Sequence, residues 1–462
     1  MNIYTKIIIA LIAVLAFPGI NNTYSQLPNQ NMVLLSNKNE HPPTGGSQYS
    51  AIWGYKAPNG REYAILGCAT GTAFVDITDS LNIHEVDFQP GLTSSWREMK
   101  VYSHYAYIVS EATNSGLQII DLQYLPDSVH FVRTYTFANY GKTHTISQSG
   151  PYLYMNGGDY LNGGVFILDL ANPELPVKRG QWETYYVHDC RVVNDTIWAC
   201  NIYNPPGTIT IINATNKNNL QTVTSWVNNP NPFPHNIALT SNRAYAYTTD
   251  ETQTPNGKLK VWNVQNLSNI QFVTNWQPTG ITTAIVHNVE IYGSIAVIAH
   301  YTAGVRVLNI TNPAAPAEFA WYDTYPSTNN NNYDGCWGVF MFPSGKIIAS
   351  DRSTGLYVLR PNLSITGIRP SKNSPTKSSL EQNYPNPFNP STTIKYFLPK
   401  NSHVSLKIYN VVGKEIASLV DGIEDAGEHS VNFDASELAG GVYFYTIYAD
   451  GFTDTKRMTL IK

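Results

Sequence analysis

Charged side chains are scarce in this chain. Asp, Glu, Lys and Arg make up 13% of its 462 residues, about half of the ~25% that is usual in globular proteins. No stretch is rich in Lys or Arg, and the formal net charge is −4, which argues against nucleic acid as a partner. Tyr, Asn, Thr and Gly are used instead, and they suit a turn-rich β structure with a polar, uncharged surface.

Recognised catalytic motifs are lacking as well. The chain has no G-x-S-x-G elbow for a serine nucleophile, no P-loop and no dinucleotide-binding fingerprint. Residues 350–355 only approach the Ser-x-Asp-x-Gly-x-Thr-Trp box of sialidases. The sequence therefore leaves open whether the protein is an enzyme, and it favours a protein that is not one.

Only one long apolar run occurs, and it lies near the N-terminus. Lys6 precedes the apolar residues 7–17, and a cleavage site fits before Gln26. A membrane span needs ~20 apolar residues, so this run is too short for one. We expect residues 1–25 to be a signal peptide, and we expect no transmembrane segment in this exported chain.

Cysteine is also rare, with four residues in the chain. Cys190 and Cys200 flank two predicted strands joined by a turn at residues 194–195. Export places them in an oxidising environment, and cross-strand partners in a hairpin can approach closely enough to bond. We therefore predict a Cys190–Cys200 disulfide, whereas Cys68 and Cys336 are expected to be buried free thiols.

A short sequence motif that recurs seven times indicates the architecture. A glycine is followed by β-branched and apolar residues, usually ending on Asp or Asn. The copies cover residues 71–76, 116–121, 164–169, 207–213, 257–263, 304–309 and 355–359. A period of ~40–50 residues with several short strands per repeat is typical of β-propeller blades. We expect an all-β chain in which residues 30–361 form a seven-bladed propeller.

The ends of this region and the tail complete the predicted organisation. The last repeat has only three predicted strands, and residues 32–36 can supply the fourth, which would cover two exposed sheet edges. Residues 362–380 are rich in Ser, Pro, Asn and Lys, as in a linker. Alternating short strands over residues 381–462 predict a small immunoglobulin-like β-sandwich.

The tail resembles a known export signal. Residues 383–390, 392–396, 409–415 and 440–444 are similar to motifs of the type A C-terminal sorting domain of type IX secretion substrates. This resemblance implies a route through the periplasm to the cell surface or the medium, with the type IX secretion machinery as a partner.

The propeller region resembles the choice-of-anchor B family, which is built from LVIVD-type repeats. The similar stretches include residues 52–55, 60–65, 71–77, 96–101 and 322–326. The resemblance implies a surface-located propeller. It implies no activity, because propellers carry many unrelated functions.

Polar and aromatic residues recur where the innermost strand of each repeat begins. These are Trp53, Trp96, His144, His188-Asp189, His235-Asn236, His287-Asn288 and Trp337, with Asp334 just before the last. The next strand of the repeats ends on Glu111, Asp159, Asn201, Asp250-Glu251, His300 and Asp351-Arg352. If the repeats are equivalent, these groups meet at one mouth of the central channel. The candidate ligand site is Trp53, Trp96, Glu98, Glu111, His144, His188, Asp189, His235, Asp250, Glu251, His287, His300, Asp334, Trp337 and Asp351.

Three interpretations of this set compete. His144, His188, His235 and His287 could hold a divalent metal ion, since imidazole and carboxylate suit Zn, Mn or Fe. Without metal, the tryptophans could stack on a glycan or peptide while the histidines and carboxylates supply hydrogen bonds. In the third interpretation each histidine satisfies loop backbone groups and locks neighbouring blades together.

These observations predict a secreted or cell-surface binding module for a glycan, peptide or small molecule. The alternative is a metal-dependent extracellular hydrolase or lyase that uses the same residues. A purely structural surface protein is the third possibility.

Overall fold

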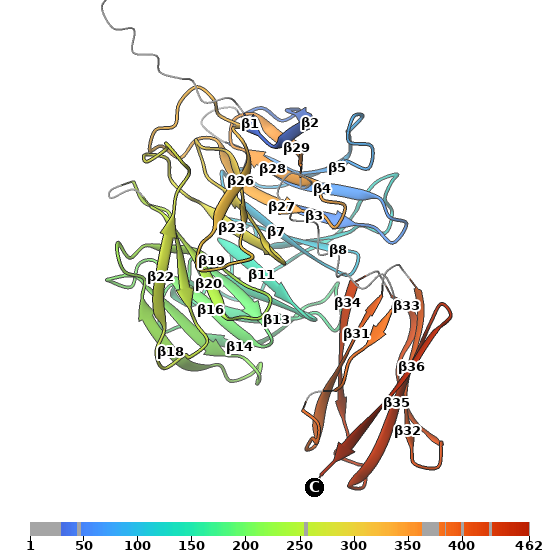
Figure 1. Cartoon of the computed structure of the whole chain (residues 1–462). Coiled ribbons are helices and arrows are strands. Elements are labelled where there is room, and N and C mark those ends of the chain that lie inside the picture. The colour runs from blue at the N-terminus through green and yellow to red at the C-terminus, as the bar shows by residue number, and fades with distance from the viewer. Residues whose placement is uncertain are drawn as a thin grey trace, which may run out of the picture. The chain divides into compact units, whose positions relative to one another are not determined.

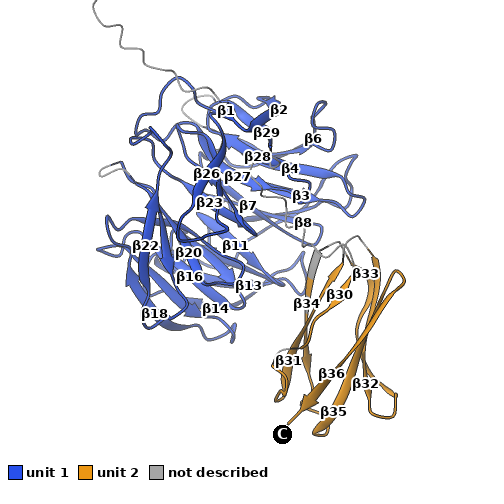
Figure 2. Cartoon of the chain, in the orientation of Figure 1, with its two compact units in different colours: residues 1–362 blue, residues 363–462 orange. Residues whose placement is uncertain are grey.

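The computed structural model describes residues 29–43, 48–253, 257–362, 378–383, 385–398, 402–424 and 427–461. The chain divides into two compact units, residues 1–362 and 363–462 (Figure 2). The predicted signal peptide and most of the predicted linker lie outside the described residues. Within those residues, no helix has the length and apolarity that a membrane crossing requires.

Seven antiparallel sheets make up the described part of the first unit (Figure 1). In each of four sheets, four strands that are consecutive in the sequence lie side by side in order. The first two sheets are β3 (Ile52–Lys56), β4 (Glu62–Cys68), β5 (Gly71–Asp76) and β6 (His84–Pro90), and then β7 (Arg97–Tyr102), β8 (Tyr105–Ser110), β9 (Leu117–Asp121) and β10 (His130–Tyr135). The next two are β11 (Thr145–Ser149), β12 (Tyr152–Asn156), β13 (Val165–Asp169) and β14 (Val177–Trp182), and then β15 (Asp189–Val193), β16 (Thr196–Asn201), β17 (Thr208–Asn213) and β18 (Gln221–Val227).

The other three sheets follow the same order, and two of them gain an N-terminal strand. They contain β19 (Pro234–Leu239), β20 (Tyr245–Asp250), β21 (Leu259–Asn263) and β22 (Gln271–Trp276); β23 (Asn288–Tyr292), β24 (Ile295–Ala299), β25 (Val305–Asn309) and β26 (Ala317–Tyr322), with β1 (Asn29–Gln30); and β27 (Cys336–Met341), β28 (Ile347–Asp351) and β29 (Gly355–Pro361), with β2 (Met32–Lys38). The only helical element among the described residues is the 3-10 turn η1 (Leu161–Gly163).

The recurring glycine motif falls on the third strand of each repeat in the first unit. These strands are buried along most of their length, as β5 and β13 show. Strands covered on both faces are rich in β-branched and apolar residues, and one core cluster joins side chains of β4 and β5 to side chains of β28 and β29. The glycine itself is required at Gly304, where φ is +76° and a Cβ atom would lie 2.3 Å from the Tyr322 carbonyl oxygen. Sheets stacked face to face in this way form a propeller.

The first and last sheets of this unit lie side by side, blue next to orange in Figure 1. Strand β2 pairs with β29 from Met32 opposite Pro361 to Lys38 opposite Leu356. Lys346, just before β28, forms a 2.8 Å ion pair with Glu62 of β4, and it also donates to the Ile77 carbonyl. Strand pairing and a buried ion pair therefore join segments that are far apart in the sequence.

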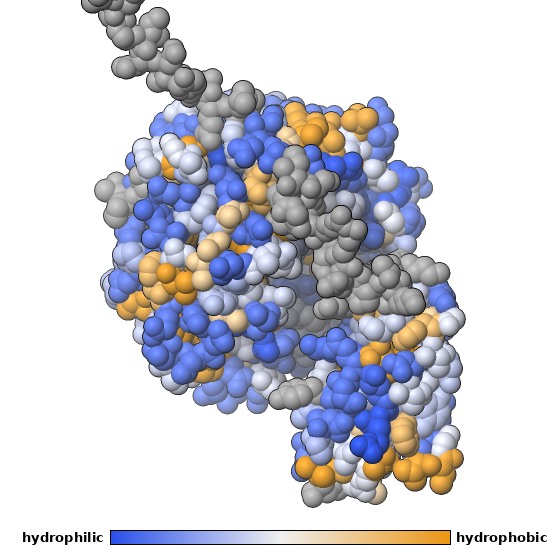
Figure 3. Space-filling model, viewed as in Figure 1, coloured by the Kyte–Doolittle hydropathy of each residue, from blue (hydrophilic) through white to orange (hydrophobic). Residues whose placement is uncertain are grey.

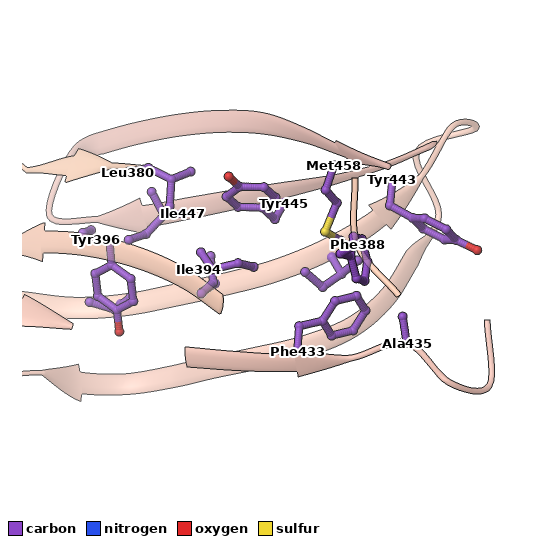
Figure 4. Close-up of a cluster of buried hydrophobic side chains, with 14 of the residues drawn as sticks. Leu380, Phe388, Ile394, Tyr396, Phe433, Ala435, Tyr443, Tyr445, Ile447 and Met458 are labelled. Atoms are coloured by element: carbon purple, nitrogen blue, oxygen red, sulfur yellow. The ribbon is translucent and has the colours of Figure 1, made fainter. Parts of the chain in front are cut away.

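The second unit is a small β-sandwich. One sheet contains β30 (Ser379–Leu380), β31 (Ser391–Leu398) and β34 (Gly427–Asp434), and the other contains β33 (Glu415–Glu424), β32 (Ser402–Asn410), β35 (Gly441–Ala449) and β36 (Phe452–Leu460). Figure 4 shows their buried side chains, including Phe388, Ile394, Phe433 and Tyr445. The prediction of an all-β chain, a propeller followed by a small sandwich, is confirmed.

The predicted Cys190–Cys200 disulfide is wrong, because all four cysteines are free and buried. In the hairpin of β15 and β16, Cys190 lies opposite Ala199, and Cys200 lies opposite Asp189. An offset of one residue sends the two side chains to opposite faces of the sheet. Their thiols accordingly belong to two different core clusters. Cys68 and Cys336 are free, as expected.

The free thiols can be counted directly. We expect four thiols per chain to react with an alkylating reagent after unfolding without reductant, measured by intact mass. Samples reduced before unfolding serve as the control and should give the same mass. A mass lower by two labels in the unreduced sample would contradict the structure.

The ion pair between the first and last sheets should contribute strongly to stability. The side chains of Lys346 and Glu62 are each 6% exposed, so Lys346→Ala leaves a buried carboxylate without its cation. We expect the free energy of unfolding to fall by ~3 kcal/mol, measured by denaturant titration. Lys38→Ala, which removes a more exposed pair with Glu40, should cost less than about 1 kcal/mol. Equal effects of the two substitutions would contradict this account.

Candidate functional site

A cavity of about 480 Å³ opens where the first strands of the sheets begin. We call it the mouth cavity, and it is lined by Trp96, Glu111, His144, Tyr186, His188, Tyr203, Glu251, Tyr301, Tyr333, Trp337 and Arg352. First strands of neighbouring sheets contact one another, for example β7 with β11 and β11 with β15. Residues at equivalent strand starts are therefore brought together although they are 40 to 50 residues apart in the sequence.

Four of these strand starts carry histidine, and their rings form a continuous row. Ring centroids are 4.2 Å apart between His144 and His188, 4.5 Å between His188 and His235, and 4.5 Å between His235 and His287. Trp337 continues the row, 4.7 Å from His287. We call the four histidines the histidine row.

Two carboxylates at the ends of second strands face the histidine row. Glu111 accepts a 2.6 Å hydrogen bond from Nδ1 of His144. Glu251 lies 3.4 Å from Nε2 of His235 and 3.9 Å from Nε2 of His287. It also accepts a hydrogen bond from the Tyr301 hydroxyl.

Aromatic side chains form much of the cavity wall. Trp96 meets Trp337 edge to face at 6.3 Å, and Tyr186 lies 5.0 Å from Tyr203. The Arg352 guanidinium stacks 4.8 Å over Trp337. Trp96 is 39% exposed and Tyr203 is 65% exposed, so both offer apolar faces to a ligand.

A narrow space of about 20 Å³ continues from the mouth cavity and is lined in part by Glu98, Asp189, His235 and His287. A further space of about 30 Å³ is lined by Glu98 and Asp189 together with Trp53 and Lys100. Trp53 carries the Lys100 ammonium over its ring at 4.1 Å. Trp53, Glu98 and Asp189 therefore lie inside the channel and do not line the mouth cavity.

Burial sets the charge state of two histidines of the row, His188 and His287. Burial, together with the charges of His144 and His235, holds the pKa of His188 well below its usual value. Burial and His235 do the same to the pKa of His287. For Glu111, burial would raise the pKa, but the hydrogen bond and charge of His144 outweigh it and lower the pKa. His188 and His287 are thus neutral at physiological pH, with a ring lone pair available.

Four other predicted site residues line neither the mouth cavity nor the two narrow spaces beside it. Asp250 forms a 2.7 Å buried pair with Lys260, and burial raises its pKa to about 7 despite that partner. Asp351 accepts hydrogen bonds from the backbone amides of Ser353 and Thr354. The remaining two are Asp334, which accepts from Asn332, and His300, whose ring lies 6.2 Å from that of Trp276. These side chains serve local packing and turns.

The residues that sequence reasoning missed are mostly their neighbours. Tyr301 follows His300 and Arg352 follows Asp351, whereas Glu251, which follows Asp250, was itself a predicted site residue. These pairs stand at or just after the ends of β28, β24 and β20, and the second member of each pair lines the cavity. Tyr186, Tyr203 and Tyr333 come from connecting segments. Their closeness in sequence to His188, Asn201 and Asp334 was the available signal.

Two family models match parts of the chain. A secretion system C-terminal sorting domain matches residues 382–462, and an LVIVD repeat matches residues 285–324. The repeat covers β23 to β26 and includes His287 of the row. The sorting domain confirms the resemblance of the tail to type IX secretion substrates and indicates export to the cell surface or the extracellular space.

Solved structures of low sequence identity are similar to this chain. A "putative 6-phosphogluconolactonase" from Bacteroides uniformis is 10% identical with a TM-score of 0.50, over 83% of this chain and 99% of that one. A hypothetical selenium-binding protein from Sulfolobus tokodaii is 11% identical with a TM-score of 0.48, over 88% of this chain and 94% of that one. At such identities the likeness concerns the fold alone. A comparison with curated protein sequences finds no match.

The buried His300 should make the fold sensitive to acid. Burial, with the charge of Arg306, lowers the pKa of His300 to about 3 from 6.5. The unfolded chain therefore takes up a proton below pH 6.5 that the folded chain takes up only near pH 3, so stability falls as the pH falls through this window. Between pH 7 and pH 5 we expect His300 alone to cost about 2 kcal/mol of unfolding free energy. Denaturant titrations at both pH values should show this loss diminished in His300→Gln, and an unchanged loss would contradict the assignment.

Proposed function

We propose that this protein is an extracellular binding module and that the mouth cavity takes up a glycan, a peptide or a small molecule. Its organisation would be a signal peptide at residues 1–25, a closed seven-bladed ring at 30–361 of choice-of-anchor B type, a linker at 362–380 and a sorting domain at 381–462. The seven sheets, the pairing of β2 with β29 and the sorting-domain match support this organisation.

The observation that carries the proposed function is the lining of the mouth cavity. Its volume of about 480 Å³ lies in the ~300–1,000 Å³ range of ligand sites. Six aromatic side chains supply stacking surfaces, while Glu111, Glu251 and Arg352 supply directed polar contacts. Apolar walls with a few convergent polar groups are typical of small-ligand sites.

The face of the molecule that Figure 3 draws gives less support to a broad protein-docking surface. Figure 3 shows a mainly hydrophilic face with apolar side chains in small, separate groups. Large exposed apolar patches mark protein interfaces, so the concave site is the better candidate for recognition.

A second candidate is a metal-dependent hydrolase or lyase. His188, His235 and Glu251 offer ligand atoms close to one another, and a bound metal ion could activate water or polarise a carbonyl group. His144 with Glu111 adds a hydrogen-bonded acid–base pair at the same cavity. Binding remains the preferred proposal because it needs only the cavity.

Glycan and peptide arrays probed with the full chain test the binding proposal. We expect the captured ligand to bind about tenfold or more weakly to Trp96→Ala and Tyr203→Ala, since each removes an aromatic face of the cavity. Tyr124→Ala, which removes a tyrosine that is 48% exposed and does not line the cavity, is the matched control. Capture that persists in both cavity variants, or is lost equally in the control, would overturn the proposal.

A further inference from the structure

Three side chains from two neighbouring sheets converge at the floor of the mouth cavity. His188 precedes β15, His235 lies in β19, and Glu251 follows β20. One ligand atom from each lies within 4.8 Å of those of the other two. The histidines are 7% and 4% exposed, and the Glu251 side chain is 18% exposed. The cluster is therefore a built part of the interior and not a chance grouping on the surface.

The hydrogen bond behind the His235 ring leaves its other nitrogen turned towards the cluster. Nδ1 of His235 lies 3.2 Å from the His287 carbonyl oxygen, which can only accept, so Nδ1 is a donor and Nε2 is the nitrogen that faces the cluster. That Nε2 faces Glu251 Oε2 at 3.4 Å. A proton on Nε2 or a metal ion between the two atoms gives the carboxylate a favourable contact. Backbone acceptors behind a histidine are also what fixes the ring in metal sites.

His188 provides an independent observation. Its Nε2 lies 3.1 Å from Nε2 of His144, whose Nδ1 is bonded to Glu111. The other ring nitrogen of His188, Nδ1, is buried without a hydrogen-bond partner among the described residues. A buried polar atom without a partner calls for an explanation, and a bound ion is one of the few.

We propose that His188, His235 and Glu251 together bind one divalent first-row transition-metal ion. Two imidazoles and a carboxylate are a ligand set for Zn²⁺ and for Fe²⁺. Ligand atoms about 2.0–2.2 Å from a tetrahedral ion lie about 3.4 Å from one another, and His235 Nε2 and Glu251 Oε2 already have this separation. The ligand atom of His188 lies within 4.8 Å of both and would move closer on binding. The Tyr301 hydroxyl bonded to Glu251 acts as a positioning group that orients the carboxylate.

The metal site goes beyond the binding function proposed above. Three protein ligands leave coordination positions free, and the mouth cavity is the space next to them. A bound ion would give the cavity an electrophilic floor for an anionic or oxygen-rich ligand. The ion itself needs no such ligand, so the two proposals can fail separately.

Metal binding is tested on the full chain carrying an affinity tag without histidines. The protein is stripped with chelator, titrated with Zn²⁺ against a chelating dye, and analysed for bound metal by mass spectrometry after dialysis. We expect one Zn²⁺ per chain, and about 100-fold weaker binding for His235→Ala and Glu251→Gln. Glu251→Gln keeps an acceptor for Tyr301 and should remain folded. His104→Ala, a histidine whose side chain is 36% exposed and outside the cluster, should bind as the unaltered chain does.

Two further readouts separate a ligand role from a structural one. Tyr301→Phe should weaken Zn²⁺ binding by about 10-fold, and Co²⁺ should give an intense visible spectrum, typical of few-coordinate nitrogen and oxygen ligation, that Glu251→Gln loses. An unaltered chain that binds none of Zn²⁺, Co²⁺, Mn²⁺ or Fe²⁺ would overturn the proposal, as would binding that is equal in all variants. Array capture by the chelator-treated chain without metal binding would leave the binding function standing and remove the metal site.

Discussion

The contact between first strands of neighbouring sheets is the constraint on which the rest of this structure depends. These strands belong to different sheets, so their backbones are not paired with each other, and side chains must satisfy the facing carbonyl groups. His235 and His287 donate to the carbonyl oxygens of His287 and Trp337 in the next sheet. The Thr145 hydroxyl donates in the same way to the His188 carbonyl oxygen. At these three boundaries, a residue at the start of an inner strand holds its sheet to the next one.

This arrangement unites two interpretations that seemed to compete in the sequence. The histidines do lock neighbouring sheets together, and for His235 and His287 that role uses Nδ1. An imidazole has two nitrogens on different sides of the ring, so Nε2 is left to face Glu251. A residue that fixes the spacing of the inner strands can therefore also present a donor atom to the cavity.

The second unit has its own core and its own family match. The core consists of its own side chains, from Leu380 to Leu460. The sorting-domain match covers nearly all of this sandwich. Export is thus encoded in the sandwich, and the candidate ligand site lies wholly in the propeller.

The sequence by itself determined the fold class, the third strand of every sheet and the strand starts that meet at the cavity. It could do so because the third strand of each sheet is buried on both faces, which imposes the same apolar motif in each repeat. Equivalent repeats also place equivalent residues together. Tertiary structure alone decided which strand-end residues face the cavity. The sequence pointed to His300 and Asp351, but their neighbours Tyr301 and Arg352 line it; of the predicted pair Asp250 and Glu251, only Glu251 does. Neighbouring residues point in different directions, and the Cys190–Cys200 pair failed for that reason, since a shift of one residue in a strand turns a side chain to the other face.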